Sequence, residues 1–256
     1  MAGSSEGGAG IDPMHQFEVH PIVELPALAG IDTSFTNSSL WMVLAVGLSG
    51  LFLLMASSRS ALVPGRLQLM GEMAYGFVAN MVKENVGTEG MKYFPFIFSL
   101  FMFILFCNML GMLPYSFTVT SHLIVTFALA ATVFLLITGV GFARHGIGFL
   151  KLFVPSGIPA ILLPLLVVIE VISYLTRPVS LSVRLFGNMM AGHTMLKIFG
   201  GFVVGLGSAG LVPLAIAPFA LMVAFTGLEL LIAGLQAYVF TILTCIYLNE
   251  AIHMDH

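Results

Sequence analysis

Charged residues are scarce in this chain of 256 residues: only 8% are Asp, Glu, Lys or Arg, whereas 59% are hydrophobic. A soluble globular domain carries about 25% charged residues, which keep its surface in water. The composition therefore indicates an integral membrane protein. With nine Lys and Arg in all and a net charge of −3, the chain also lacks the basic surface that nucleic acid requires, so no nucleic-acid partner is expected.

Cysteine is rare as well, and the chain has two. Cys107 and Cys245 lie within apolar runs and show no CxxC spacing, which predicts buried thiols rather than a disulfide or a metal pair. Four histidines near the ends of the chain have no cysteine or acidic cage around them: His15, His20, His253 and His256. We therefore expect no metal site and no cofactor.

The motifs of soluble-type catalysis are missing. The sequence contains no GxxxxGK[ST] phosphate-binding loop, no HExxH zinc motif and no GxSxG nucleophile elbow. It also lacks the matching pair of discontinuous helices that many secondary transporters place in two inverted halves. We expect a membrane protein that is not itself an enzyme.

Long hydrophobic runs are what the sequence does contain. They predict an all-α integral membrane protein with spans at about 38–57, 94–113, 123–143, 157–200 and 210–250, in a single membrane domain of residues 38–256 that follows an extended tail of residues 1–37. The last two runs are too long for upright spans, because about 44 helical residues extend roughly 66 Å, twice the bilayer core. They must either tilt steeply or bend into two spans each. The glycine-rich stretch from Gly200 to Gly210 predicts the turn between them.

Residues 66–86 form an amphipathic segment between the first two spans. Its apolar residues follow a 3.6-residue period, and its polar residues occupy the opposite side: Met70, Met73, Ala74, Phe77, Val78 and Met81 against Gln68, Glu72, Lys83 and Glu84. This pattern fits a helix on the membrane surface, or one packed on a neighbouring subunit.

The placement of Lys and Arg predicts the orientation. Arg59, Arg66, Lys83 and Lys92 flank the amphipathic segment, and Arg144 and Lys151 follow the third span, whereas residues 1–39, 114–122 and 200–212 contain no Lys or Arg. By the positive-inside rule, the N-terminus lies outside and, after five crossings, the C-terminus lies inside.

Ionisable residues within the two long runs are the candidate functional residues, because each is costly in a membrane without a partner or water. On a helix, Asn188 lies about 40° from Arg184, and Glu170 returns to the same face about 21 Å away, so these three residues form one stripe. The alternative for Arg184 is an ion pair that only fixes helix packing, and the alternative for Glu170 is a position near the inner interface.

His193 points about 180° away from Arg184 on a regular helix. Its natural partner is Glu229 on the returning helix, since an imidazole and a carboxylate pass a proton in a low-dielectric setting. Gln236 lies on the face of Glu229. Asn188, Asn108 and Gln236 either line a water path or join helices by hydrogen bonds, and Arg177 and Lys197 are expected to reach toward the interface.

The segments SVRLFGNMMAGH and ELLIAGLQAYVFTILTCIYLNEA resemble subunit a (subunit 6) of F-type ATP synthases, and FCNMLGMLPYSFTVTSH resembles an earlier segment of the same family. The resemblance runs from about residue 38 to the end of the chain. It implies a stator subunit of the membrane sector, whose last two helices lie as a near-horizontal hairpin against a rotating c-ring. Peripheral stalk subunits of the b type are the other implied protein partners, and ATP is made on other chains.

In that family an essential arginine, which Arg184 matches, separates two proton half-channels and attracts the ring carboxylate. Glu170 matches a position of the inner half-channel. The other polar residues match the outer half-channel: Glu229, His193, Asn188, Gln236 and Asn108. Some bacterial members carry Glu where this chain has His193 and His where it has Glu229, so the resemblance leaves open which group accepts the proton.

Two other classes of function are compatible with these residues. A stand-alone proton-coupled carrier would use Arg184 to bind an anion, and a structural scaffold would conduct no ions. The long polar N-terminal tail favours a bacterial cytoplasmic membrane over the mitochondrial inner membrane. The choice between proton and sodium depends on the ring.

Overall fold

The computed structural model describes residues 17–23, 34–58, 64–113, 116–154 and 162–253. Its helices are α1 (Asn37–Ser57), α2 (Arg66–Val86), α3 (Phe94–Gly111), α4 (Leu123–His145), α5 (Leu163–Ser208) and α6 (Val212–Ile252). Within the described residues, five helical segments are long and apolar enough to cross a membrane, and they contain α1, α3, α4, α5 and α6. The predicted all-α fold with two very long final helices is confirmed.

Shorter elements connect the helices. The tail forms a small antiparallel sheet from β1 (Pro21–Val23) and β2 (Phe35–Thr36). It is pinned to the helices where the Asn37 side-chain amide donates to the carbonyl of Glu18, and where Nε2 of His122 lies 2.9 Å from the carbonyl of Phe17. Single 3-10 segments precede α3 (η2, Thr88–Tyr93), precede α4 (η3, Val119–Ser121) and follow α4 (η4, Gly146–Phe153).

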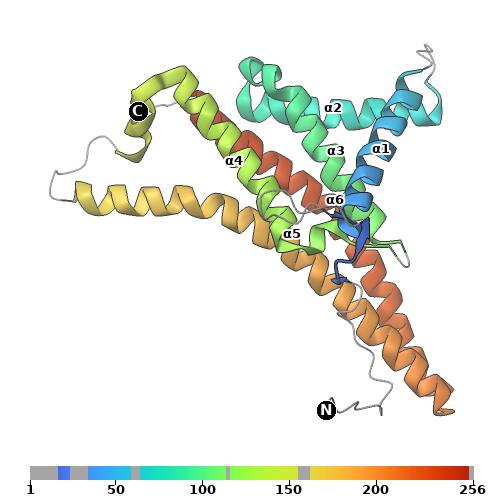
Figure 1. Cartoon of the computed structure of the whole chain (residues 1–256). Helices are drawn as coiled ribbons and strands as arrows, with labels where there is room; N and C mark the ends of the chain where they lie inside the picture. Colours follow the sequence, from blue (N-terminus) through green and yellow to red (C-terminus); the bar gives the residue numbers. More distant parts are fainter. Residues whose placement is uncertain (1–16, 24–33, 59–63, 114–115, 155–161, 254–256) are drawn as a thin grey trace.

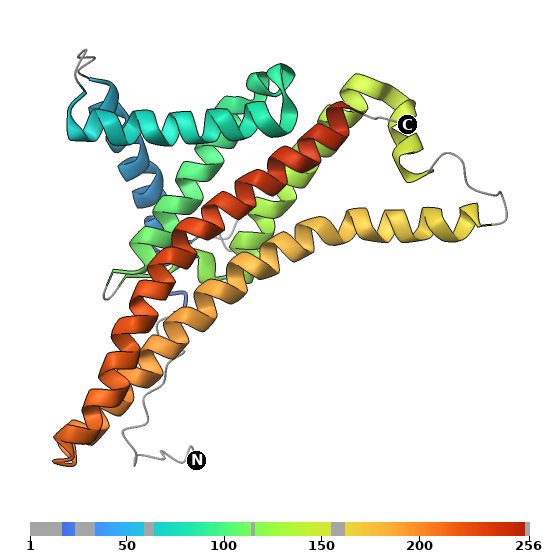
Figure 2. The ribbon, with the colours of Figure 1, turned by 180° about the vertical axis from the view of Figure 1, so that it is seen from behind.

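The helices divide into two groups that share α3 and α6. Figure 1 shows α2 lying across the ends of α1 and α3, and α2 also contacts α6. On the other side, α5 packs against α4 and α6, and α3 also packs against α6. Seen from behind in Figure 2, α5 and α6 run side by side toward the tip that joins them and diverge toward their other ends. The pair is thus one long antiparallel hairpin carried by α3 and α4.

The turn of this hairpin is much shorter than predicted. The prediction of a turn from Gly200 to Gly210 is wrong, because α5 continues helically to Ser208 and only residues 209–211 connect it to α6. Gly210 makes this tight connection with a φ of 76°. Membrane helices tolerate glycine, since continuing the helix satisfies backbone groups that hydrocarbon leaves unpaired. At the other end of α5, residues 157–161 of the predicted span lie outside the described residues.

Both long helices are continuous and contain an internal proline, Pro178 in α5 and Pro218 in α6. Proline removes one backbone hydrogen bond and crowds the carbonyl four residues earlier, which bends a helix without ending it. The bend of α5 is visible in Figure 2. Division of each run into two separate upright spans, the alternative to tilting, is therefore not what the chain adopts.

The apolar core lies where α3, α4 and α6 meet, and it contains fully buried Ile97, Ile104, Phe240 and Leu248. Cys107 and Cys245 are buried free thiols, as their apolar surroundings predicted.

Gly141 on α4 lets the chain fold back closely. The ring of Phe149 in η4 is only 1% exposed, and a Cβ on Gly141 would lie 2.3 Å from it.

We predict that Gly141→Ala destabilises the protein by about 1–3 kcal/mol, because the buried ring must shift to admit a methyl group. Gly139→Ala is the matched control, since nothing lies within 4 Å of a Cβ there and both changes alter helix propensity equally. The measurement is thermal unfolding in detergent. An equal change in the two variants would contradict the tight packing of Phe149.

Candidate functional site

Among the described residues, the polar contacts between α5 and α6 include three that join a side chain of one helix to a side chain of the other. From the hairpin tip outward they join His193 to Glu229, Asn188 to Gln236, and Arg177 to Glu250. Along this series the residue numbers fall on α5 and rise on α6, as antiparallel packing requires. The hairpin therefore carries a ladder of polar groups in a segment that is otherwise almost wholly apolar.

His193 and Glu229 form the most enclosed of these contacts. Nδ1 of His193 lies 2.7 Å from Oε1 of Glu229, and the two residues are 7% and 4% exposed. Gly192 permits this approach, because a Cβ there would lie 2.8 Å from Oε1 of Glu229. Both Glu229 oxygens have no hydrogen-bond partner among the described residues, because the close contact with Nδ1 lacks the alignment of a hydrogen bond. Nε2 of His193, on the other side of the ring, also has no hydrogen-bond partner among them.

The second contact lies nearer the middle of the hairpin. The Asn188 side-chain amide donates to Oε1 of Gln236 at 3.0 Å. Gln236 is buried, and its Nε2 has no partner among the described residues. Buried polar atoms without partners are costly. Their concentration at these two contacts, on Gln236, Glu229 and His193, is typical of a route for water or protons rather than of a purely structural core.

Asn108 reaches this region from α3. Its side-chain amide donates to the carbonyl of Ala233 at 3.2 Å, and its side-chain oxygen accepts from the hydroxyl of Thr120 in η3 at 2.9 Å. Ala233 lies one turn from Glu229 on α6. Asn108 thus joins three elements beside the buried pair, and its amide is already committed to hydrogen bonds.

Arg184 is placed differently from all of these groups. It is exposed on α5, and no hydrogen bond or ion pair joins its side chain to another described residue. Asn188, one turn further along α5, is also exposed. Glu170 is half-buried and is not joined to Arg184. The expected stripe of Glu170, Arg184 and Asn188 therefore shares a helix without direct contacts among its members.

The ion pair between Arg177 and Glu250 was not anticipated from the sequence. The guanidinium of Arg177 also lies over the rings of Tyr174 and Tyr247, 5.3 and 4.8 Å from their centroids. Antiparallel register was the available signal, because pairing His193 with Glu229 brings Cys245 opposite Arg177, and Glu250 follows little more than one turn later on α6. The sequence predicted only that Arg177 reaches toward the interface. In the structure it also has an anionic partner, Glu250.

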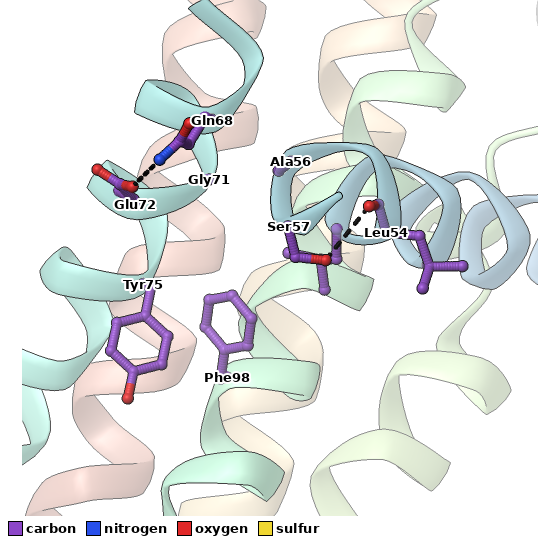
Figure 3. Close-up of a pocket in the computed structure, with 10 residues that line it drawn as sticks. Leu54, Ala56, Ser57, Gln68, Gly71, Glu72, Tyr75 and Phe98 are labelled. Atoms are coloured by element: carbon purple, nitrogen blue, oxygen red, sulfur yellow. Dashed lines mark hydrogen bonds between the residues drawn. The ribbon is translucent and has the colours of Figure 1, made fainter. Parts of the chain in front are cut away.

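A cavity of about 730 Å³ lies apart from the hairpin, between α1, α2 and α3. Figure 3 shows Tyr75 and Phe98 on its wall and the hydrogen bond from Gln68 to Glu72 at its edge. None of its lining residues belongs to α5 or α6. The cavity is therefore separate from the polar ladder.

Comparison with known proteins identifies the family. The family model described as ATP synthase A chain matches residues 39–249. The chain is 58% identical to ATP synthase subunit a of Parvibaculum lavamentivorans, over 98% of this chain and 96% of that protein. It is 58% identical to the Pelagibacter ubique subunit, over 96% and 99% of the two chains, and 57% identical to the Rhodospirillum rubrum subunit, over 94% and 98%.

The matched range contains Arg184 and the His193–Glu229 and Asn188–Gln236 contacts. The chain therefore belongs to the ATP synthase A chain family, as a non-catalytic, multi-pass subunit of the membrane sector that translocates protons.

Proposed function

We propose that the α5–α6 hairpin provides two proton half-channels that face a ring of carboxylate-bearing c subunits, with Arg184 between them. The observation that carries this proposal is the contrast along one hairpin between a buried, titratable His193–Glu229 pair and an exposed arginine. A proton crosses by neutralising a ring carboxylate, which then moves through lipid before releasing the proton on the other side. Proton flow thereby drives rotation and supports ATP synthesis on other chains.

The outer half-channel runs past Glu229 and His193, with Asn188, Gln236 and Asn108 beside it. The 2.7 Å contact between the imidazole and the carboxylate supports a proton relay, because an imidazole and a carboxylate in direct contact can pass a proton from one to the other. The unpartnered Nε2 of Gln236 and both Glu229 oxygens provide further places for water.

Arg184 acts as the gate. A guanidinium keeps its proton, so it cannot relay protons, and it repels other cations. Its exposure on α5 supports direct interaction with a ring carboxylate that has lost its proton. Arg184 thereby prevents a direct leak between the two half-channels and favours the ionised form of the carboxylate that faces it.

Protons leave through an inner half-channel near Glu170. The positive-inside rule orients the chain with its N-terminus outside and its C-terminus inside the bacterial cytoplasmic membrane. In this arrangement the hairpin is nearly horizontal against the c-ring, and b-type peripheral stalk subunits hold the chain in place. The half-buried position of Glu170 near the start of α5 supports its contact with inner water.

We predict that Arg184→Ala abolishes ATP-driven proton pumping in inverted membrane vesicles, because the ring carboxylate loses its cationic partner. Respiration should still acidify the same vesicles, provided that the passive leak through the variant is blocked with a ring inhibitor. Lys83→Ala, a change to an exposed cation of α2, is the control and should pump normally. Normal ATP-driven pumping by Arg184→Ala would refute the gate.

A second prediction concerns the acid–base pair. His193→Glu and Glu229→His should each reduce pumping by at least about tenfold, because each leaves two groups of the same kind in contact and removes the relay. The double variant restores one imidazole and one carboxylate and should pump faster than either single variant. Pumping rates normalised to the amount of assembled complex provide the measurement. A double variant slower than both single variants would argue against a relay formed by the pair.

A further inference from the structure

Helix α5 carries two arginines on nearly the same face. Arg177 and Arg184 are seven residues apart, and on a regular helix this spacing puts the second within about 20° of the first and about 10.5 Å along the axis. A rotor carboxylate that passes this face in a low-dielectric setting is attracted by any uncompensated cation within such a distance. For the carboxylate to stop only at Arg184, the charge of Arg177 must therefore be neutralised by another group.

The surroundings of Arg177 neutralise its charge. Its guanidinium is paired with Glu250 from the last turns of α6, and its side chain is 19% exposed. The rings of Tyr174 and Tyr247 lie beside the same guanidinium. Tyr174 is itself held from α4, because its hydroxyl lies 2.7 Å from the hydroxyl of Thr138. Three helices thus cooperate to enclose and neutralise this one charge.

Arg184 has no comparable anionic partner among the described residues. It is exposed, and no anionic side chain within the described ranges forms an ion pair with it. The nearest polar residues along the hairpin, Asn188 and Gln236, are neutral amides bonded to each other. The same helix face therefore presents one compensated and one uncompensated guanidinium.

We propose that Glu250 is a charge-masking residue: by neutralising Arg177, it leaves Arg184 as the cation at which the rotor carboxylate docks. Glu250 does not contact the proton or the ring in this role and acts only through Arg177. The inference rests on the proposed function of Arg184 as the partner of the ring carboxylate. Without the mask, the carboxylate would be held at a second position two helical turns away, and each rotational step would be delayed.

The experiment compares Glu250→Gln, Arg177→Gln and the double variant in inverted vesicles, with ATP hydrolysis and proton pumping measured per assembled complex. Masking predicts that Glu250→Gln slows hydrolysis and pumping together, about three- to tenfold, with the ratio of pumping to hydrolysis unchanged. The double variant, which has no cation to mask, should recover to within about twofold of the original rate. Arg177→Gln alone should behave like the double variant.

Glu89→Gln is the matched control. It breaks the other arginine–glutamate ion pair seen within the described residues, between Arg144 and Glu89, which lies away from the α5 face. Its rates should be unchanged. If Glu250→Gln does not assemble, Glu250→Asp replaces it, since the shorter side chain withdraws the carboxylate from Arg177 and should produce the same coupled slowing to a smaller degree.

Two results would overturn the proposal. If Glu250→Gln lowers pumping while hydrolysis continues, the pair is a structural tie whose loss lets the hairpin leak. If the double variant is as slow as Glu250→Gln, the free charge of Arg177 is not the cause. Arg184→Ala distinguishes failure of the proposed function from failure of this inference. Normal pumping in that variant refutes the role of Arg184 as the gate. Abolished pumping in Arg184→Ala, combined with normal rates in Glu250→Gln, refutes only the charge-masking role of Glu250.

Discussion

Hydrocarbon provides no hydrogen bonds and poorly solvates charge, and the architecture of this protein follows from that constraint. The constraint keeps α5 and α6 helical over 46 and 41 residues, through internal prolines and a glycine-rich end. It also favours contacts between polar side chains of the two helices, of which three are seen. An antiparallel hairpin meets these demands in part, because the backbone bonds internally and six polar side chains contact one another in pairs across the helix contact.

The partners differ systematically along the hairpin. At one end the contact joins an imidazole to a carboxylate, in the middle it joins two neutral amides, and at the other end it joins a guanidinium to a carboxylate. Only the first contact is suited to moving protons. The ion pair stabilises the helix contact and neutralises its charge, while Arg184 stays outside the ladder and keeps its charge available. Function thus depends on which polar groups lack partners as much as on which have them.

Most of the helices and one of the polar contacts between α5 and α6 were predictable from the sequence. Hydrophobic length predicted the five apolar helices, and the amphipathic period from Arg66 onward predicted α2, because both signals are local. Angular spacing from Arg184 placed His193 on another face and suggested Glu229 as its partner, and the two lie in contact. The pair of Arg177 and Glu250 was missed because it depends on the register of two helices, 73 residues apart in the chain. The glycine-rich turn was misplaced because rules from soluble proteins overstate how strongly glycine interrupts a membrane helix.

The resemblance implies that some family members exchange His and Glu between positions 193 and 229, and the contact itself offers a physical explanation. The space at this point is created by Gly192, whose lack of a side chain admits the Glu229 carboxylate against α5. An imidazole at position 229 would use the same space, and a glutamate at position 193 would approach from the opposite side. What the fold specifies is therefore a gap between two helices that holds one acid and one base in contact, and the helix that supplies each group is secondary. A larger apolar residue at position 193 or 229 would push the helices apart, since the small residue and the polar pair together determine how near α5 and α6 lie at this contact.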